Sequence, residues 1–213
     1  MFMSEEAAGA YNKTIQAIRV LGLGGSTRPD SSSERALRVA LDAAAGCGAV
    51  TELIAGRELM FPIYDTQSAT RPPGVQVFLS AVRRADAVIL ASPGYHGTLS
   101  GMIKNALDYL EDLRADARPY LDGMPVGCVA VAYGWQATTS TLQSLRTTVH
   151  ALRGWPSPMG AAINASAVVF GPSGEFADDS SLFQLQLVGR QVTEFALLRA
   201  RWSQVALVTG SPA

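Results

Sequence analysis

With 213 residues, the chain is long enough for one α/β domain with a full hydrophobic core, and it fits two domains less well. Hydrophobic residues make up 48% and charged residues 16%, which is the composition of a globular rather than a disordered protein. The formal net charge of −1 argues against a nucleic-acid or anionic-membrane partner, because those surfaces attract clustered basic residues.

We expect neither a membrane-spanning segment nor a signal peptide in this sequence. No stretch is long enough to span a bilayer, and residues 1–16 lack the apolar segment of a signal peptide. We expect 1–16 to be a flexible extension, 17–204 to form one domain, and 205–213 to be a loose tail. Cys47 and Cys128 stand in no metal or redox spacing, so they are predicted to be reduced core or near-core thiols of a cytoplasmic protein.

Hydrophobic periodicity divides the first half of the chain into strands and helices. An apolar run predicts a strand over 18–23, and a helical pattern follows over 36–45. A short strand is predicted over 50–54, then a proline-interrupted loop over 57–73 and a helix over 75–82. The continuous apolar run 87–91 is typical of a central parallel strand buried on both faces.

The second half repeats this alternation. A loop over 92–98 leads to a helix over 102–110, and an apolar strand over 126–133 leads to a loop over 134–139. A helix over 141–152, a strand over 161–163 and a long helix over 182–198 complete the pattern. The alternation predicts an α/β fold: an open, doubly wound, parallel five-stranded sheet with helices on both faces.

Ligands of such sheets bind outside the carboxyl ends of the strands, where the strand order reverses. This rule selects the loops 24–33, 92–98 and 134–139. The first is a strand–turn–helix rich in glycine and hydroxyl groups, which is a ready anion site because amide groups and the helix dipole point outward there. Arg28 adds a charge-assisted donor, and Ser26, Ser31 and Ser33 add hydroxyls. Two explanations without a ligand stand beside this one: Ser31 and Glu34 have capping-box spacing, and the glycines suit an ordinary turn.

Other nucleotide and catalytic motifs do not match. The dinucleotide pattern G-x-G-x-x-G fails because Thr27 stands where the third glycine belongs. The chain has no Walker A loop, no H-E-x-x-H zinc motif and no G-x-S-x-G nucleophile elbow. No metal ligand set is predicted. A terminal monophosphate fits the loop better than a diphosphate.

Two motifs together resemble the NADPH-dependent FMN reductase family. They are GSTRxxS at 25–31, and SPxYHG at 92–97 followed by GMIKNALDYL at 101–110, and the resemblance covers 18–164. It implies a flavodoxin-like fold, FMN and NADPH as cofactors, and hydride transfer from the nicotinamide to FMN and on to free flavin, a quinone or a similar acceptor. It also implies the cofactor-binding residues. These are Ser26, Arg28, Ser31 and Ser33 at the phosphate, Pro93, Gly94, Tyr95, His96 and Gly97 along the isoalloxazine ring, and Gly134 and Trp135 beside the flavin.

One position departs from the family pattern, and several roles stay open. Gly94 stands where the family usually has glutamate, which affects a flavin-edge or subunit contact. Tyr95 either stacks on the flavin or is an ordinary loop aromatic, and Trp135 either caps the flavin or anchors its loop. His96 is expected to position rather than to protonate, because the cofactor carries the chemistry of hydride transfer. No catalytic side chain is predicted.

The resemblance also implies partners. Family members are commonly homodimers or homotetramers, with the 102–110 helix at the interface. A small-molecule electron acceptor is expected, and reduced flavin is suited to supply a flavin-dependent monooxygenase. The alternative function is a non-enzymatic FMN-binding electron carrier or flavin sensor, which the charge of −1 disfavours because such carriers are usually strongly acidic. A third alternative is a scaffold that binds no flavin.

Overall fold

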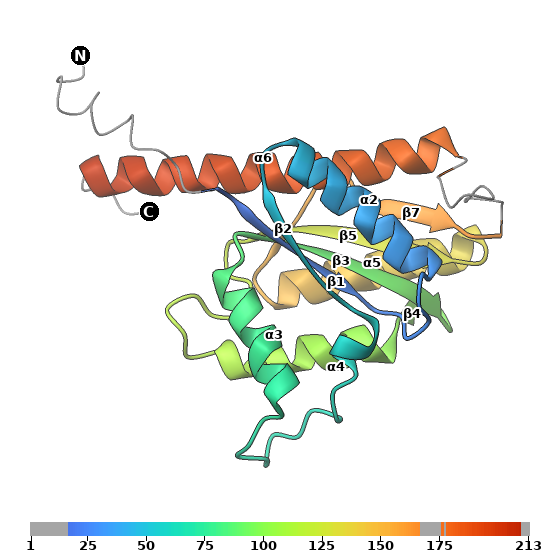
Figure 1. Ribbon diagram of the computed structural model, residues 1–213, viewed down its shortest axis with the longest axis horizontal. Helices are drawn as coiled ribbons and strands as arrows, with labels where there is room; N and C mark the ends of the chain where they lie inside the picture. The colour runs from blue at the N-terminus through green and yellow to red at the C-terminus, as the bar shows by residue number, and fades with distance from the viewer. Residues whose placement is uncertain (1–16, 167–175, 177, 210–213) are drawn as a thin grey trace.

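The structure, a computed structural model, describes residues 17–166, 176 and 178–209. Within these residues seven strands form one sheet in the order β2-β1-β3-β5-β6, with β4 beside β3 and β7 beside β5 (Figure 1). Every pairing is parallel except β3 with β4. The predicted parallel sheet is confirmed, and β6 and β7 share its fifth position. The strands are β1 (Arg19–Gly24), β2 (Val50–Ala55), β3 (Ala87–Tyr95), β4 (Thr98–Leu99), β5 (Pro125–Ala132), β6 (Trp155–Pro156) and β7 (Ala161–Asn164).

Helices cover both faces of the sheet, as the sequence predicts. Apolar side chains of α2 and α6 form one core layer with the sheet, and those of α3, α4 and α5 form the other. Figure 1 shows α2 and α6 together above the strands, with α3 and α4 below. The helices are α2 (Ser32–Gly46), α3 (Pro73–Arg84), α4 (Gly101–Asp108), α5 (Trp135–Ala151) and α6 (Asp179–Thr209), with 3-10 turns at Gly56–Leu59 and Tyr109–Leu113.

The centre of the sheet is buried on both faces because a helix layer lies on each side. All eight residues of β5 are buried, and β3 is buried from Ala87 to Ser92. The continuous apolar runs in the sequence are explained by this position, since a strand with one solvated face would alternate polar and apolar residues. The predicted buried thiol is confirmed at Cys128, whereas Cys47 at the end of α2 is exposed and not in the core.

Three predicted boundaries are wrong. The loop over 92–98 is absent, because β3 continues to Tyr95 and turns back at once into β4. Most of the loop over 134–139 is absent as well, since α5 begins at Trp135 rather than at 141. The last helix runs to Thr209, so residues 205–209 are helical rather than a loose tail. The predicted extension 1–16 and the last residues, 210–213, lie outside the described part of the chain.

None of the helices that the structure describes, the long α6 included, has an apolar stretch sufficient to cross a membrane.

Candidate functional site

The carboxyl ends of the strands meet along one edge of the sheet. Gly24 at the end of β1 is in register with Ala55 of β2 on one side and with Ala91 of β3 on the other. The chain therefore leaves β1 for β2 and returns on the opposite side for β3. This reversal is the point at which ligands of doubly wound sheets bind, and the 25–31 turn lies there.

The hydroxyls of the 25–31 turn are buried around the start of α2. Ser31 is the N-cap residue, and its Oγ accepts from the Glu34 amide at 3.2 Å and lies 3.1 Å from the Ser33 Oγ. Ser26, Ser31 and Ser33 are all less than 7% exposed. The predicted capping box is half formed, because the Glu34 carboxylate instead pairs with Arg38 at 2.7 Å. Ser31 thus caps the helix, the Ser33 hydroxyl bonds with that of Ser31, and the Ser26 hydroxyl accepts from the Arg28 amide.

Backbone donors at this turn are left without acceptors. Among the described residues, the amides of Ser26, Ser32 and Ser33 make no hydrogen bond, and the latter two stand in the first turn of a helix, where no intrahelical acceptor exists. Arg28 is exposed, and its own amide donates to the Ser26 Oγ at 3.3 Å. Unpaired amides, hydroxyls, a helix N-terminus and a guanidinium are the donor set of a phosphate site. The residues present therefore fit the phosphate of FMN.

Gly25 holds this turn against its neighbours. Its amide donates to the Ala91 carbonyl at 2.9 Å, and its carbonyl accepts from the Ser100 Oγ at 2.7 Å. A Cβ at Gly25 would lie 2.1 Å from Ile103 Cγ1 and 2.8 Å from the Ser100 Oγ. The glycine is required because α4 approaches the backbone this closely.

The SPxYHG motif forms the end of a strand and a tight hairpin. Gly94 pairs with Leu99 and Tyr95 with Thr98. The two turn residues have positive φ, 51° at His96 and 83° at Gly97, which is the geometry of a type I′ turn. Tyr95 is 54% exposed, and His96 and Gly97 are exposed as well. The hairpin thus exposes residues 95–97 of the motif to solvent.

The first two turns of α5 pack against this hairpin. Thr141 Oγ1 donates to the Thr98 carbonyl at 3.3 Å, and the Ala137 carbonyl lies 3.5 Å from the position of a Cβ at Gly94. Gly134, with φ of 92°, precedes the helix, and its amide donates to Asn164 Oδ1 at the end of β7 at 2.8 Å. Trp135 opens α5 and is 62% exposed.

Contacts between these segments bring the predicted site residues to one edge of the sheet: Ser100 bonds the 25–31 turn to the start of α4, and Thr141 bonds α5 to the hairpin. Sequence reasoning missed the residues that make these ties: Ser92, Ser100, Thr141 and Asn164. Signals in the sequence point to two of these four residues. Ser100 has N-cap spacing before the 102–110 helical pattern, and Asn164 is the polar residue that ends an apolar strand.

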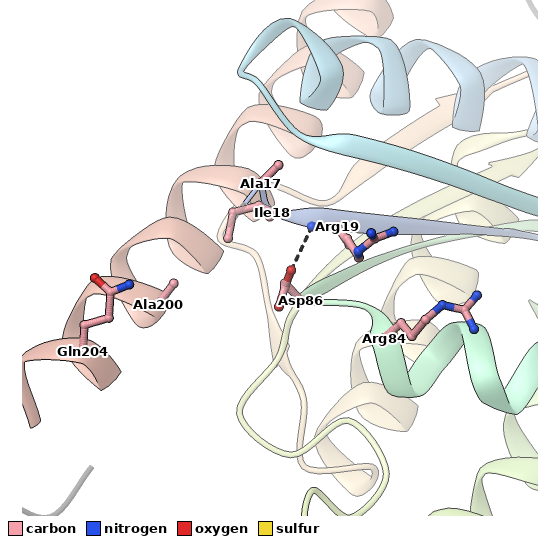
Figure 2. A pocket seen from close by; sticks show the side chains of 7 residues that line it. All are labelled: Ala17, Ile18, Arg19, Arg84, Asp86, Ala200 and Gln204. Carbon is pink, nitrogen blue, oxygen red and sulfur yellow. Dashed lines mark hydrogen bonds between the residues drawn. The ribbon is translucent and has the colours of Figure 1, made fainter. Parts of the chain in front are cut away.

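A cavity of about 210 Å³ lies at the other end of the sheet (Figure 2). Residues at the start of β1 and just before β3 line this cavity. There the Arg19 amide donates to the Asp86 carboxylate at 2.8 Å. Figure 2 shows the Arg19 and Arg84 side chains at this cavity together with Ala200 and Gln204 of α6. Because this is the amino end of the strands, the cavity is separate from the site above. In the described ranges no group of His, Cys, Asp and Glu is placed to hold a metal ion.

Comparison with known proteins agrees with this geometry. The family model described as NADPH-dependent FMN reductase matches residues 18–168. An NAD(P)H-dependent FMN reductase of Pseudomonas aeruginosa is 32% identical over 186 residues, which cover 82% of this chain and 94% of that protein. An FMN-dependent NADPH-azoreductase of Staphylococcus aureus is 34% identical over 102 residues, 48% of this chain and 50% of that protein. Among solved structures, the flavoenzyme NAD(P)H:acceptor oxidoreductase of Paracoccus denitrificans has a TM-score of 0.71 at 22% identity, covering 85% of this chain and 98% of that one, which supports the flavodoxin-like fold.

Proposed function

This chain belongs to the NADPH-dependent FMN reductase family, and from that membership we propose how its residues bind FMN and serve the reaction. The protein is an FMN-dependent NAD(P)H oxidoreductase. A bound FMN supplies the ring that accepts the hydride of the nicotinamide. The protein has to bind that ring, orient it and leave one face open to the nicotinamide.

The phosphate of FMN binds in the 25–31 turn. The observation that carries this assignment is the set of unpaired amides at Ser26, Ser32 and Ser33 beside the buried hydroxyls. Arg28 closes the turn from the solvent side, with a guanidinium that pairs with two phosphate oxygens. The macrodipole of the fifteen-residue α2 adds about half a positive charge at the same point.

The β3–β4 hairpin and the start of α5 would hold the isoalloxazine ring. The hairpin would contribute Pro93, Gly94, Tyr95, His96 and Gly97, and the start of α5 would contribute Gly134 and Trp135. The hairpin is fixed by cross-strand pairing and by Thr141, so it offers the ring a rigid edge. Rigid walls lower the barrier by holding hydride donor and acceptor at near-attack distance. No side chain is required to transfer a proton in this step.

The acceptor after FMN is a small molecule such as free flavin, a quinone or an azo compound. The azoreductase relative supports the last class by its name alone. Reduced flavin released by the protein is suited to supply a flavin-dependent monooxygenase. We further propose a homodimer or homotetramer in the cytoplasm, with the exposed side of α4 at the subunit interface.

One experiment tests the proposed activity. The purified protein is mixed with FMN, its visible absorbance spectrum is recorded, and NADPH is titrated without air. We expect a perturbed flavin spectrum that bleaches on addition of NADPH and returns on addition of a quinone or an azo dye. A protein that binds FMN but is not bleached would be an electron carrier or sensor, and a protein that does not bind FMN would contradict the proposed site.

A further inference from the structure

Two buried serines connect the hairpin to the phosphate turn. Ser92 Oγ accepts from the Ser100 amide at 2.8 Å and donates to the Pro93 carbonyl at 2.9 Å. Ser100 Oγ accepts from the Ile103 amide at 3.3 Å and donates to the Gly25 carbonyl at 2.7 Å. Ser92 is fully buried and Ser100 is 2% exposed. Water therefore does not replace these bonds when they are lost.

The bond to Gly25 fixes more than one carbonyl. In a planar trans peptide the carbonyl and the next amide point in opposite directions. When Ser100 holds the Gly25 carbonyl toward α4, the Ser26 amide points away from α4. That amide is without an acceptor among the described residues. The preceding peptide is fixed as well, because the Gly25 amide donates to Ala91.

From this geometry we propose that Ser100 is a positioning residue for the phosphate of FMN. It orients the Gly25–Ser26 peptide so that the Ser26 amide donates to the phosphate, and Ser92 holds Ser100 in place from the hairpin side. The inference rests on the proposed phosphate site. It assigns to Ser100 part of the preference for FMN over riboflavin, which has the same ring system without the phosphate.

The test separates phosphate binding from ring binding. The Kd values for FMN and riboflavin are measured by flavin fluorescence for the wild type and for Ser100→Gly and Ser100→Ala. Glycine is tolerated at an N-cap, so Ser100→Gly removes the donor to Gly25 while α4 keeps its start. We expect the Kd for FMN to rise about tenfold, the scale of one positioned hydrogen bond, and the Kd for riboflavin to stay nearly unchanged.

Ser157→Ala is the matched control. Ser157 is also buried, and its Oγ donates to the Met159 carbonyl at 2.7 Å, but it lies between β6 and β7. This variant loses the same kind of bond, and we expect its FMN-to-riboflavin preference to be that of the wild type. An equal loss of both affinities in Ser100→Gly, or an unchanged Kd for FMN, would overturn the role of Ser100.

Arg28→Ala is measured in parallel. It distinguishes a failure of the proposed role of Ser100 from a failure of the proposed phosphate site. If Arg28→Ala lowers the preference for FMN and the Ser100 variants do not, the phosphate turn is correct and Ser100 has no positioning role. If neither residue affects the preference, the phosphate site itself is misassigned.

Discussion

Gly94 and Thr141 approach each other so closely that no side chain fits between them. A Cβ at Gly94 would lie 2.6 Å from Thr141 Oγ1 and 2.7 Å from the Cβ of Ala132. Thr141 meanwhile holds the hairpin through the Thr98 carbonyl. Residues of α5 and β5 therefore occupy the space that a side chain at position 94 would need. The glutamate that the resemblance leads one to expect there does not fit this packing.

A side chain at Gly94 should destabilise the packing of the hairpin against α5. We expect Gly94→Ala to lower the free energy of unfolding by about 1–3 kcal/mol, the range for an overpacked contact, and Gly94→Glu to lower it further. Thermal or urea unfolding measures this. Gly46→Ala is the control, since a Cβ there meets nothing within 4 Å. A fully stable Gly94→Glu variant would show that α5 moves aside.

Arg28→Ala should weaken FMN binding by roughly 2–3 kcal/mol, the scale of a charge-assisted hydrogen bond removed at an anion. This corresponds to a Kd that is higher by roughly 30- to 160-fold. Fluorescence titration at two salt concentrations measures it, and Arg35→Ala, in the first turn of α2, serves as the charge control. An unchanged Kd for FMN in Arg28→Ala would contradict the assignment of the phosphate turn.

Variants of His96 test whether this residue positions the flavin or transfers a proton. Its φ of 51° is left-handed, a conformation that asparagine also adopts readily. We expect His96→Asn to keep the type I′ turn and to reduce the anaerobic rate of FMN reduction by NADPH only slightly. His96→Val should disturb the turn, because a β-branched residue is strained there. A loss of about a hundredfold or more in His96→Asn, the scale of general-acid catalysis, would contradict the positioning role.

Arg71 fastens the segment between β2 and α3. Its guanidinium binds Asp112 with two bonds of 2.7 and 3.0 Å and lies over the rings of Tyr64 and Tyr109. The hydrogen bond to Asp112 raises the pKa of Arg71 above its ordinary value. Because the guanidinium uses its planar fork here, Arg71→Lys should restore little of what Arg71→Ala loses. We expect chymotrypsin to cleave after Tyr64 faster in both variants than in the wild type. Arg83→Ala is the control: it breaks only the more exposed pair with Asp116, so its cleavage rate should equal that of the wild type.

The two cysteines should react very differently. Burial raises the pKa of the Cys128 thiol to about 12, so almost no thiolate forms at that position near neutral pH. Cys47 is exposed. At pH 8 we expect a thiol reagent to modify one cysteine in the native protein and both in guanidinium, with Cys47→Ser removing the native reaction. Native modification of Cys128 would show that the core opens around β5.

The flavodoxin-like order of elements could be predicted from the sequence because it depends on local signals. Apolar runs such as 87–91 stay apolar whichever strands lie beside them, and helical spacing repeats within each helix. The turn at 25–31 was predictable for the same reason, since Ser31 caps the helix that follows it in the chain. Lys104 and Asp108, four residues apart in α4, likewise form an ion pair at 2.6 Å, which their spacing in the sequence favours.

The contacts that join the turn, the hairpin and the helices are made between residues far apart in the chain. The SPxYHG segment has the punctuation of a loop, yet cross-strand pairing makes it the end of β3 and a hairpin. Ser100 and Gly25 are 75 positions apart, and Thr141 and Thr98 are 43 apart. Local patterns carry no information on such pairs, because the energy of each contact exists only after the sheet has brought the segments together. The sequence by itself therefore determined the elements and the donor-rich composition of the 25–31 turn, whereas the tertiary structure decided which backbone groups of the described residues are held and which amides are left without an acceptor.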